Sequence, residues 1–424
     1  MSGLFVNDVR LPDGKSAQIL IQDGRIKTVG QGLDPPPDFS RVAGRGRLVI
    51  PGAIDMHVHF RTPGGEHKET FATGSLAAAK GGTTTVADMP NTDPPTTTVE
   101  RLETKLRLAQ GAAVSVLINF GVEPDRLEEL RRAVLNPAVK TVKVYMGPST
   151  GVGGLAPEAV DRTFRLAAEL NIPVMVHAED MALIQAEAQR HPHDARHHHL
   201  LRPLAAELSA VEQALALAKT WGNRLYLCHV TSAAVLDRVE ASGIREQVFV
   251  EVCPHHLVLS LDAIAAPLEN RYKVNPPLRE ESQRRELFAA LKNRIDGLAS
   301  DHAPHTKEEK SAPYDEAPSG IPGVEYLLPL ALTWWREGHI GMQRMIDLTS
   351  ANVARFLDLP KGSLQPGRDA DLVLVDPEHQ WRIGAGGDSV ASKCGWSPYE
   401  GRSVLARPEV TIAGGEVVYT VDEG

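Results

Sequence analysis

Short apolar segments alternate with helix-like stretches through the middle of this 424-residue chain. We expect eight strands, with an amphipathic helix between most of them. This order is typical of an α/β fold of the (β/α)8 TIM-like barrel type, and no Gly-rich dinucleotide fingerprint follows an early strand to favour an open doubly wound sheet. The expected strands are Ala53–His59, Thr83–Asp88, Val114–Val122, Thr141–Tyr145, Pro173–His177, Leu225–His229, Val248–Val252 and Gly297–Asp301, and helices are expected at Val99–Gln110, Ala156–Leu170, Ala205–Thr220 and Glu281–Asn293.

The two ends of the chain resemble each other. Asp23-Gly24 and Gly414-Gly415 each lie between short apolar runs, which indicates an antiparallel hairpin near each end. We therefore expect both ends to pair into one small β-sandwich subdomain, with the barrel inserted between its parts. The expected division is 1–50 and 362–424 for the two parts of the subdomain and 51–361 for the barrel.

Composition excludes several classes of protein. The formal charge of −9 argues against nucleic-acid binding, which needs clustered Lys and Arg. No run reaches the roughly 18 apolar residues of a membrane span, and the N-terminus lacks the pattern of a signal peptide. Three scattered cysteines do not make a disulfide framework and favour a reducing cytoplasm.

Metal-type residues lie at the ends of five expected strands. In a β/α barrel, the chemistry gathers where the carboxyl ends of the strands meet. His57 and His59 are one residue apart, so a strand would project both imidazoles from one face. Imidazole and carboxylate groups together suit a divalent metal such as zinc. The candidates from the five strands are His57 and His59, Lys143, His177, His229 and Asp301.

Lys143 requires a separate explanation because an ammonium group cannot bind a cation. Strand alternation puts Lys143 on the face opposite Val142 and Val144, and if those valines meet the outer helices, the amine points into the barrel. A buried amine beside a metal is unfavourable. Reaction with carbon dioxide would make it a carbamate that can bridge two metals, roughly 3.5–4 Å apart. The alternative is a lysine in a salt bridge inside the barrel.

Other residues of the same rim receive expectations of their own. Asp301 could hold a bridging hydroxide and move its proton. We expect His302, His255 and His256 beside the metal ligands rather than among them. Cys228, which precedes His229, is expected to face away from the metal as buried filler.

Four motifs resemble those of dihydroorotase, a family of the amidohydrolase superfamily, and the resemblance covers nearly the whole chain. It implies a zinc-dependent cyclic amide hydrolase of the carboxylated-lysine type. It also implies reversible cyclisation of N-carbamoyl-L-aspartate to L-dihydroorotate by metal-bound hydroxide, in pyrimidine synthesis. The motifs are His57-Val58-His59-Phe60-Arg61, Met89-Pro90-Asn91-Thr92, Lys143-Val144-Tyr145-Met146-Gly147 and Asp301-His302-Ala303-Pro304-His305.

The resemblance also implies roles for single residues. Two zinc ions per subunit would be bridged by carboxylated Lys143, with Asp301 as the catalytic residue. One metal would take His57, His59, Lys143 and Asp301, and the other would take Lys143, His177 and His229. Arg61, Asn91, Asn275 and His305 match the family's substrate-binding residues, and Ser149 and Thr150 lie where some members carry a mobile active-site loop.

Two alternatives remain at this stage. Another cyclic amidohydrolase, such as an allantoinase or a hydantoinase, shares the metal set. A non-catalytic relative that only assembles with aspartate transcarbamoylase could dispense with the ligands, whereas this chain retains every one. The expected partner is a small-molecule substrate, without nucleic acid or membrane, and the resemblance leaves open a homodimer and a complex with aspartate transcarbamoylase.

Overall fold

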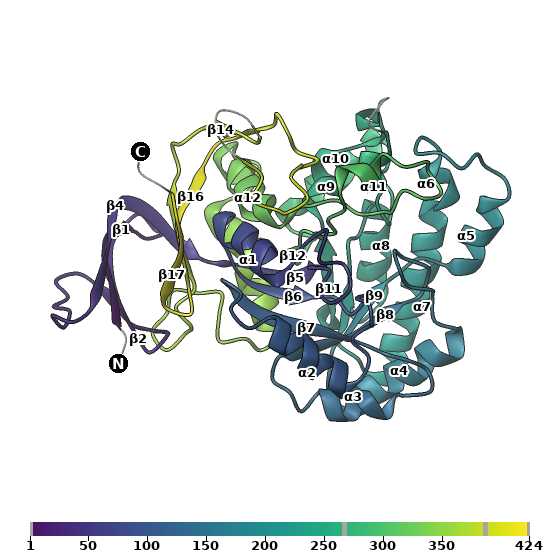
Figure 1. Cartoon of the computed structure of the whole chain (residues 1–424), viewed down its shortest axis with the longest axis horizontal. Helices are drawn as coiled ribbons and strands as arrows, with labels where there is room; N and C mark the ends of the chain where they lie inside the picture. The colour runs from purple at the N-terminus through teal and green to yellow at the C-terminus, as the bar shows by residue number, and fades with distance from the viewer. Residues whose placement is uncertain (1–2, 265–268, 385–388, 422–424) are drawn as a thin grey trace.

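The computed structural model of the chain describes residues 3–264, 269–384 and 389–421. Its larger part is a sheet of eight strands in the order β12-β11-β10-β9-β8-β7-β6-β5, in which every neighbouring pair is parallel and helices cover the outside (Figure 1). The strands are β5 (Ala53–Val58), β6 (Thr83–Asp88), β7 (Ser115–Gly121), β8 (Val139–Tyr145), β9 (Val174–His177), β10 (Leu225–Leu227), β11 (Val248–Val252) and β12 (Gly297–Leu298).

The first and last strands of this sheet meet just beyond the end of β12. His302 bridges to Val58 in parallel register. The backbone N–H of His59 donates to the carbonyl of His302 at 2.8 Å, and the N–H of His302 donates to the carbonyl of His57 at 3.3 Å. These bonds close the sheet into the predicted (β/α)8 barrel, and they place the segment after β12 directly beside the two histidines of the first strand.

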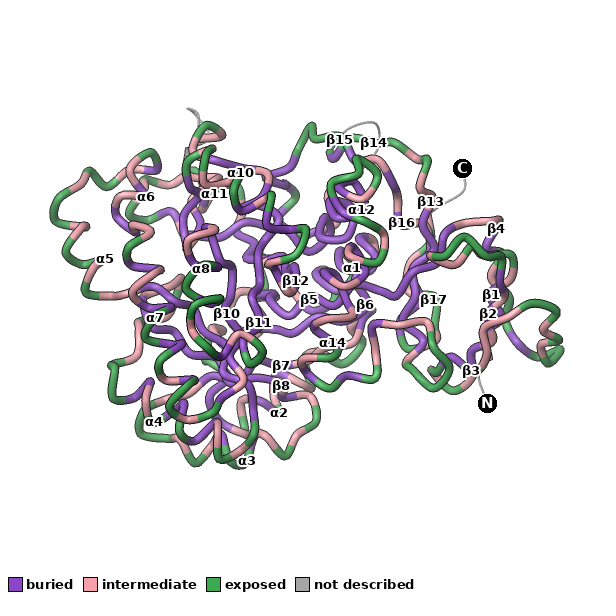
Figure 2. Tube along the Cα trace, turned by 180° about the vertical axis from the view of Figure 1, so that it is seen from behind, coloured by how far each residue is buried: buried purple, intermediate pink, exposed green. Residues whose placement is uncertain are grey.

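The helices pack on the barrel through the outward-facing residues of the strands. In β8, Val142 and Val144 join Val160 and Phe164 of helix α4 in one buried cluster. The strands are buried almost throughout, and exposed residues lie on the outer helices (Figure 2). The main outer helices are α1 (Phe71–Lys80), α2 (Val99–Leu108), α3 (Glu128–Ala133), α4 (Pro157–Glu169), α7 (Leu204–Trp221), α8 (Ala233–Ala241), α10 (Glu281–Ala289) and α12 (Leu327–Arg336), and shorter helices are α5 (Met181–Ala188), α6 (His198–Leu201), α9 (Pro254–Val258), α11 (Lys307–Lys310), α13 (Met342–Ile346) and α14 (Asn352–Phe356).

Both chain ends contribute to a second sheet of seven strands in the order β17-β16-β13-β4-β1-β2-β3. All its pairs are antiparallel except β1 with β4, which is parallel. Figure 1 shows these N-terminal and C-terminal strands side by side, to one side of the barrel. The strands are β1 (Gly3–Arg10), β2 (Ser16–Gln22), β3 (Arg25–Gly30), β4 (Ser40–Pro51), β13 (Leu372–Asp376), β16 (Arg407–Ala413) and β17 (Glu416–Thr420), and a separate short pair is β14 (Trp381–Arg382) with β15 (Ser403–Val404).

The two halves of the second sheet enclose a common apolar core. Ile19 and Ile21 from one half lie in the same buried cluster as Leu372 and Ile412 from the other. The backbone N–H of Ile26 in the edge strand β3 also donates to the carbonyl of Arg368, just before β13, at 2.9 Å, so the N-terminal half of the sheet contacts the C-terminal half. The expected sandwich is thus one continuous sheet folded over itself, whereas the domain boundaries at residues 50 and 361 stay a prediction.

Two of the expected barrel strands end two or more residues earlier than the sequence pattern indicates. Strands β10 and β12 end at Leu227 and Leu298, although the apolar runs continue to His229 and Asp301. The backbone φ angles of His229 and Asp301 are +37° and +45°, in the left-handed region that ends regular strand pairing. Both candidate residues therefore lie in the loop that follows the strand, not in the strand itself.

Candidate functional site

Three candidate residues converge at one place at the carboxyl ends of the strands. The Nε2 atoms of His57 and His59 lie 3.3 Å and 3.2 Å from Oδ1 of Asp301. Ligand atoms of these three side chains all lie within 4.8 Å of one another, which suits a shared metal ion. The first strand and the segment after the last strand meet here because the barrel closes between them.

A second pair of candidates lies beside the first group. Nδ1 of His177 and Nε2 of His229 are 3.0 Å apart, so the two imidazoles direct ring nitrogens toward the same point. The ring centroids of His229 and His57 are 5.2 Å apart, which joins this pair to the first group. The four imidazoles and Asp301 therefore form one continuous cluster at the barrel mouth.

Lys143 points into the barrel, on the face opposite Val142 and Val144, and only 1% of its surface is exposed. Its Nζ lies 3.0 Å from Sγ of Cys228. Among the described residues, no carboxylate oxygen lies within 4.0 Å of this nitrogen, so the alternative of a salt-bridged lysine is wrong. A cavity of about 60 Å³ adjoins the side chain, lined in part by Asn91 and Tyr145.

Irregular backbone directs several of these side chains into the mouth. Ile54 and Met56 of β5 lie in the cluster inside the barrel, whereas Val58 and Phe60 pack outside with helix α1. The pairing register of β5 with β6 shifts between Asp55 and Val58, and this bulge changes the inward face so that His57 and His59 point inward.

Hydrogen bonds on the far side of the rings orient two of the four imidazoles, and a carboxylate lies within ion-pair distance behind a third. His57 Nδ1 contacts Oε1 of Glu251 at 2.9 Å, and His59 Nδ1 contacts Oδ1 of Asn91 at 2.7 Å. His177 Nε2 lies 2.9 Å from Oε2 of Glu179. An acceptor on one ring nitrogen fixes the tautomer and leaves the other nitrogen with a lone pair for a metal.

The protonation behaviour of the rings agrees with this arrangement. Burial holds the pKa of His59, His177 and His229 below its ordinary value, and it lowers the pKa of His57 to about 3. Neutral imidazole is the form that binds a metal. The donor set present in the structure therefore fits a divalent ion.

Arg61 and His305 lie next to each other beside this cluster. Nη2 of Arg61 is 3.0 Å from Nε2 of His305, and Nε of Arg61 donates to the carbonyl of Pro304 at 3.2 Å. On its other side, Nδ1 of His305 lies 3.1 Å from Nζ of Lys68. The backbone of Arg61 has a φ of +60°, a strained conformation of the kind that clusters at functional sites.

Asn91 and Thr150 connect the loop after β8 to the same mouth. Nδ2 of Asn91 donates to the carbonyl of Thr150 at 3.1 Å, and Oγ1 of Thr150 donates to the carbonyl of Ser319 at 2.8 Å. Asn91 thus holds both a candidate metal ligand and the loop that we expected near the active site.

Asn275 lies in an adjoining pocket rather than against the histidines. Its Oδ1 contacts Nε2 of His198 at 3.0 Å, and the two residues line a cavity of about 230 Å³ together with Arg202, Lys273 and Ser319. Ser319 joins this cavity to the main cluster because its carbonyl contacts both Thr150 and His305.

Sequence reasoning missed the buried acids that support the ligands. Glu251 accepts from the backbone N–H of His229 at 2.9 Å as well as contacting His57. Burial raises the pKa of Glu251 to about 7. Burial would likewise raise the pKa of Glu179, but Arg202 and His177 hold it well below its ordinary value. The sequence does contain one signal for Glu251, because a charged residue within an apolar strand indicates a buried functional or paired group.

Two expectations about neighbouring residues were wrong. Cys228 does not face away from the site, because β10 places Leu225 and Leu227 outward and leaves Cys228 on the inner face next to Lys143. His302 was expected beside the metal ligands, but its imidazole accepts from the backbone N–H of Gly323 at 3.1 Å and lies 3.4 Å from Glu69. The backbone of His302 closes the barrel, while its ring faces elsewhere.

Comparison with known proteins agrees with this architecture. The family model described as the amidohydrolase family matches residues 48–420. A dihydroorotase of Halobacterium salinarum is 39% identical over 98% of this chain and 96% of its own length, and one of Methanosarcina acetivorans is 36% identical over 96% and 89%. An L-hydantoinase structure from Arthrobacter aurescens superposes with a TM-score of 0.92 at 28% identity, covering all of this chain and 97% of its own.

The chain belongs to the amidohydrolase family and, within it, to the dihydroorotases. It is accordingly a cyclic amide hydrolase built on a TIM-like barrel. None of the helices in the described part of the chain combines the length and apolar character needed to cross a bilayer.

The role of Glu251 generates a prediction. Glu251→Gln keeps the side-chain shape but removes the negative charge that orients His57, so we expect metal affinity to fall by about 10- to 100-fold. Titration against a competing chelator measures the change, with circular dichroism to verify the fold. Glu103→Gln, on the exposed face of α2, is the matched control and should bind metal like the unchanged chain. Unaltered affinity of the Glu251 variant would contradict the role assigned to this carboxylate.

Proposed function

We propose that this chain interconverts N-carbamoyl-L-aspartate and L-dihydroorotate, using metal ions held at the barrel mouth. The observation that carries the proposal is the position of Arg61 and His305 beside the cluster of imidazoles and Asp301. The cluster supplies hydrolytic chemistry for a cyclic amide, and the guanidinium supplies a partner for a substrate carboxylate. Sequence identity of 34–39% to dihydroorotases over nearly the whole chain supports the same substrate.

The proposed metals are two zinc ions. Nε2 of His57, Nε2 of His59 and Oδ1 of Asp301 would hold one ion. Nδ1 of His177 and Nε2 of His229 would hold the other, and Lys143 would serve both. When bound, such ions lower the pKa of a water molecule and polarise the carbonyl oxygen that it attacks.

Carboxylation of Lys143 is part of the proposal. The amine is buried and lacks a carboxylate partner among the described residues, and an unpaired buried charge is strongly unfavourable. The neighbouring cavity leaves space beside the side chain. As a carbamate, Lys143 would become an anionic oxygen donor on a long stem, in reach of both groups of imidazoles.

Asp301 is the proposed proton carrier. Its carboxylate lies between the Nε2 atoms of His57 and His59, at the centre of the first group. In the hydrolytic direction, Asp301 accepts the proton of the attacking water and delivers it to the ring nitrogen as the amide bond breaks. In the reverse direction, it takes the proton from the carbamoyl nitrogen as the ring closes, and water is released.

Arg61, Asn91, His305 and Asn275 are the proposed substrate contacts. The planar guanidinium of Arg61 suits a carboxylate, and its Nη1 makes no hydrogen bond with the described residues. His305 lies beside it, Asn91 contacts His59, and Asn275 lies in the adjoining pocket. Thr150, held by Asn91 and Ser319, would cover the substrate from the loop side.

Hydantoinases are the nearest alternative because solved hydantoinase structures superpose closely on this chain. Their substrates lack the ring carboxylate that Arg61 and His305 would bind in our proposal. We also propose that the chain forms a homodimer, binds aspartate transcarbamoylase and acts in the cytoplasm. A purely non-catalytic role is disfavoured by the complete set of buried metal-type residues.

A substrate comparison tests the proposed function. The zinc-loaded enzyme should hydrolyse L-dihydroorotate and cyclise N-carbamoyl-L-aspartate, with little turnover of hydantoin or allantoin, because only the first pair carries the carboxylate. Ultraviolet absorbance of the ring amide follows all three rings. Turnover of hydantoin or allantoin without turnover of dihydroorotate would reject the assignment.

Removing the proposed proton carrier should separate catalysis from folding. We expect Asp301→Asn to fold, to keep much of its metal and to lose turnover by about 100- to 10,000-fold, because the amide cannot accept the proton. Steady-state rates, metal content and circular dichroism measured on one preparation give the result. A variant that turns over at the original rate would remove Asp301 from the mechanism.

The modification of Lys143 has its own test. Intact-mass measurement under native conditions with bicarbonate present should find one added carboxyl group in the unchanged chain and none in Lys143→Met. The variant should also lose metal and turnover, whereas Lys140→Met, a partly exposed position on the same strand, should keep both. An unmodified, fully active chain would refute carboxylation.

A further inference from the structure

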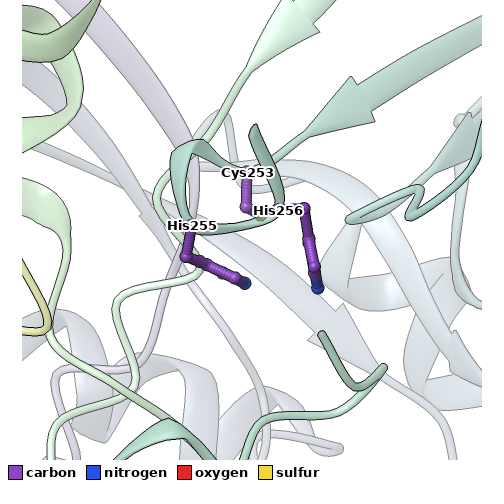
Figure 3. A group of neighbouring side chains, drawn as sticks. All are labelled: Cys253, His255 and His256. Carbon is purple, nitrogen blue, oxygen red and sulfur yellow. The ribbon is translucent and has the colours of Figure 1, made fainter. Parts of the chain in front are cut away.

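A second group of metal-type residues lies where β11 passes into helix α9. Cys253 immediately precedes the helix, and His255 and His256 occupy its first turn. Figure 3 shows both imidazoles extending from the same side of this turn, with Cys253 between them. One ligand atom from each of the three lies within 4.8 Å of the others, and all three side chains are buried.

The hydrogen bonds of the two rings leave nitrogens available. Nε2 of His256 contacts the carbonyl of Pro276 at 3.2 Å, so it carries the hydrogen and leaves Nδ1 with a lone pair. Neither ring nitrogen of His255 has a hydrogen-bond partner among the described residues, and neither does Nδ1 of His256. Buried polar groups are nearly always paired, so three unpaired nitrogens in one place require an explanation.

This group is distinct from the cluster at the barrel mouth. No hydrogen bond joins Cys253, His255 or His256 to the four imidazoles, Lys143 or Asp301 within the described parts of the chain. Among the hydrogen bonds of the described residues, one contact leads toward that cluster: Sγ of Cys253 lies 4.0 Å from Oε1 of Glu251, the residue that orients His57. The two groups are therefore neighbours with separate ligand atoms.

We propose that Cys253, His255 and His256 bind a zinc ion in addition to the ions of the catalytic mouth. One thiolate and two imidazoles are a ligand set that zinc prefers, and water can take the fourth position. Ligand atoms around tetrahedral zinc lie roughly 3.3–3.8 Å apart, so small side-chain rotations would suffice from the observed spacing. On binding, the Cys253 thiol gives its proton to solvent as the zinc–sulfur bond forms, with no change of oxidation state.

The ion would stabilise a part of the molecule that borders the substrate pocket. His256 contacts the carbonyl of Pro276, the residue after Asn275, so a metal-held helix α9 would fix the segment that carries Asn275. The role inferred for this site is thus structural support of the pocket rather than participation in the reaction.

Cobalt provides a spectroscopic test because the catalytic ligands proposed above include no cysteine. The full-length enzyme is stripped of metal with a chelator and reloaded with Co²⁺. Thiolate-to-cobalt charge transfer then gives a near-ultraviolet absorption only if a cysteine binds the ion. The chain has three cysteines, so Cys228→Ser, Cys253→Ser and Cys394→Ser test each in turn.

The expected result is a charge-transfer absorption in the unchanged chain, in Cys228→Ser and in Cys394→Ser, and its loss in Cys253→Ser with about one metal ion fewer per chain. His255→Gln guards against misfolding of the serine variant, since it keeps the thiol but should weaken or shift the absorption. Circular dichroism verifies the fold of each variant. Absence of the absorption in the unchanged chain, its persistence in Cys253→Ser or its loss in Cys228→Ser instead would overturn the proposal.

Discussion

The carboxylate of Glu251 joins three strands of the barrel at the place where the chemistry is expected. It belongs to β11, contacts Nδ1 of His57 at the end of β5 and accepts from the backbone N–H of His229 after β10. One buried group therefore sets the position of two imidazoles that belong to different halves of the cluster. Such a carboxylate is unfavourable to bury on its own, and its raised pKa reflects that. Hydrogen bonds to both neighbours compensate for the lost hydration.

The backbone conformation at the strand ends also determines where the functional side chains point. By simple alternation, Cys228 points into the barrel and His229 points out toward the helices. The left-handed backbone at His229 reverses this direction and returns the ring to the mouth. Asp301 and Arg61 have the same kind of conformation, so three functional residues depend on strain that the surrounding packing must maintain.

These features mark the limit of what the sequence could predict. The order and type of the barrel strands follow from apolar periodicity, and the prediction of Thr83–Asp88 and Val248–Val252 agrees with the structure at both ends. The orientation of Lys143 also follows from alternation, because β8 pairs regularly with β9 from Val142 to Tyr145. The bulge in β5 and the left-handed residues after β10 and β12 break the period-two rule, so the direction of Cys228 was predicted wrongly. The prediction that the imidazoles converge required one further premise, that a barrel brings the carboxyl ends of its strands together.

The acids behind the ligands were missed for a related reason. Glu179 lies only two residues after His177, but its role depends on an ion pair with Arg202 that only the folded structure brings about. One sequence, taken without an alignment of related sequences, carries no signal that these two residues pair. The apolar context of Glu251 was the better clue, since a charged residue at the centre of an apolar strand requires a buried partner.

The charge of the mouth differs from that of the whole molecule, and this difference bears on the choice of substrate. The chain carries a formal charge of −9, which would repel an anion at long range. At the mouth, however, the four imidazoles are neutral, and a carboxylated Lys143 with Asp301 would supply only two negative charges to two divalent ions. Lys68 is paired with Glu309, and Glu179 is paired with Arg202, so these charges cancel. With Arg61 beside it, the site would remain positive even if Glu251 is ionised. Local field rather than net charge decides binding in a cleft with low-dielectric walls, so a doubly charged carbamoyl amino acid fits this mouth better than a neutral hydantoin ring.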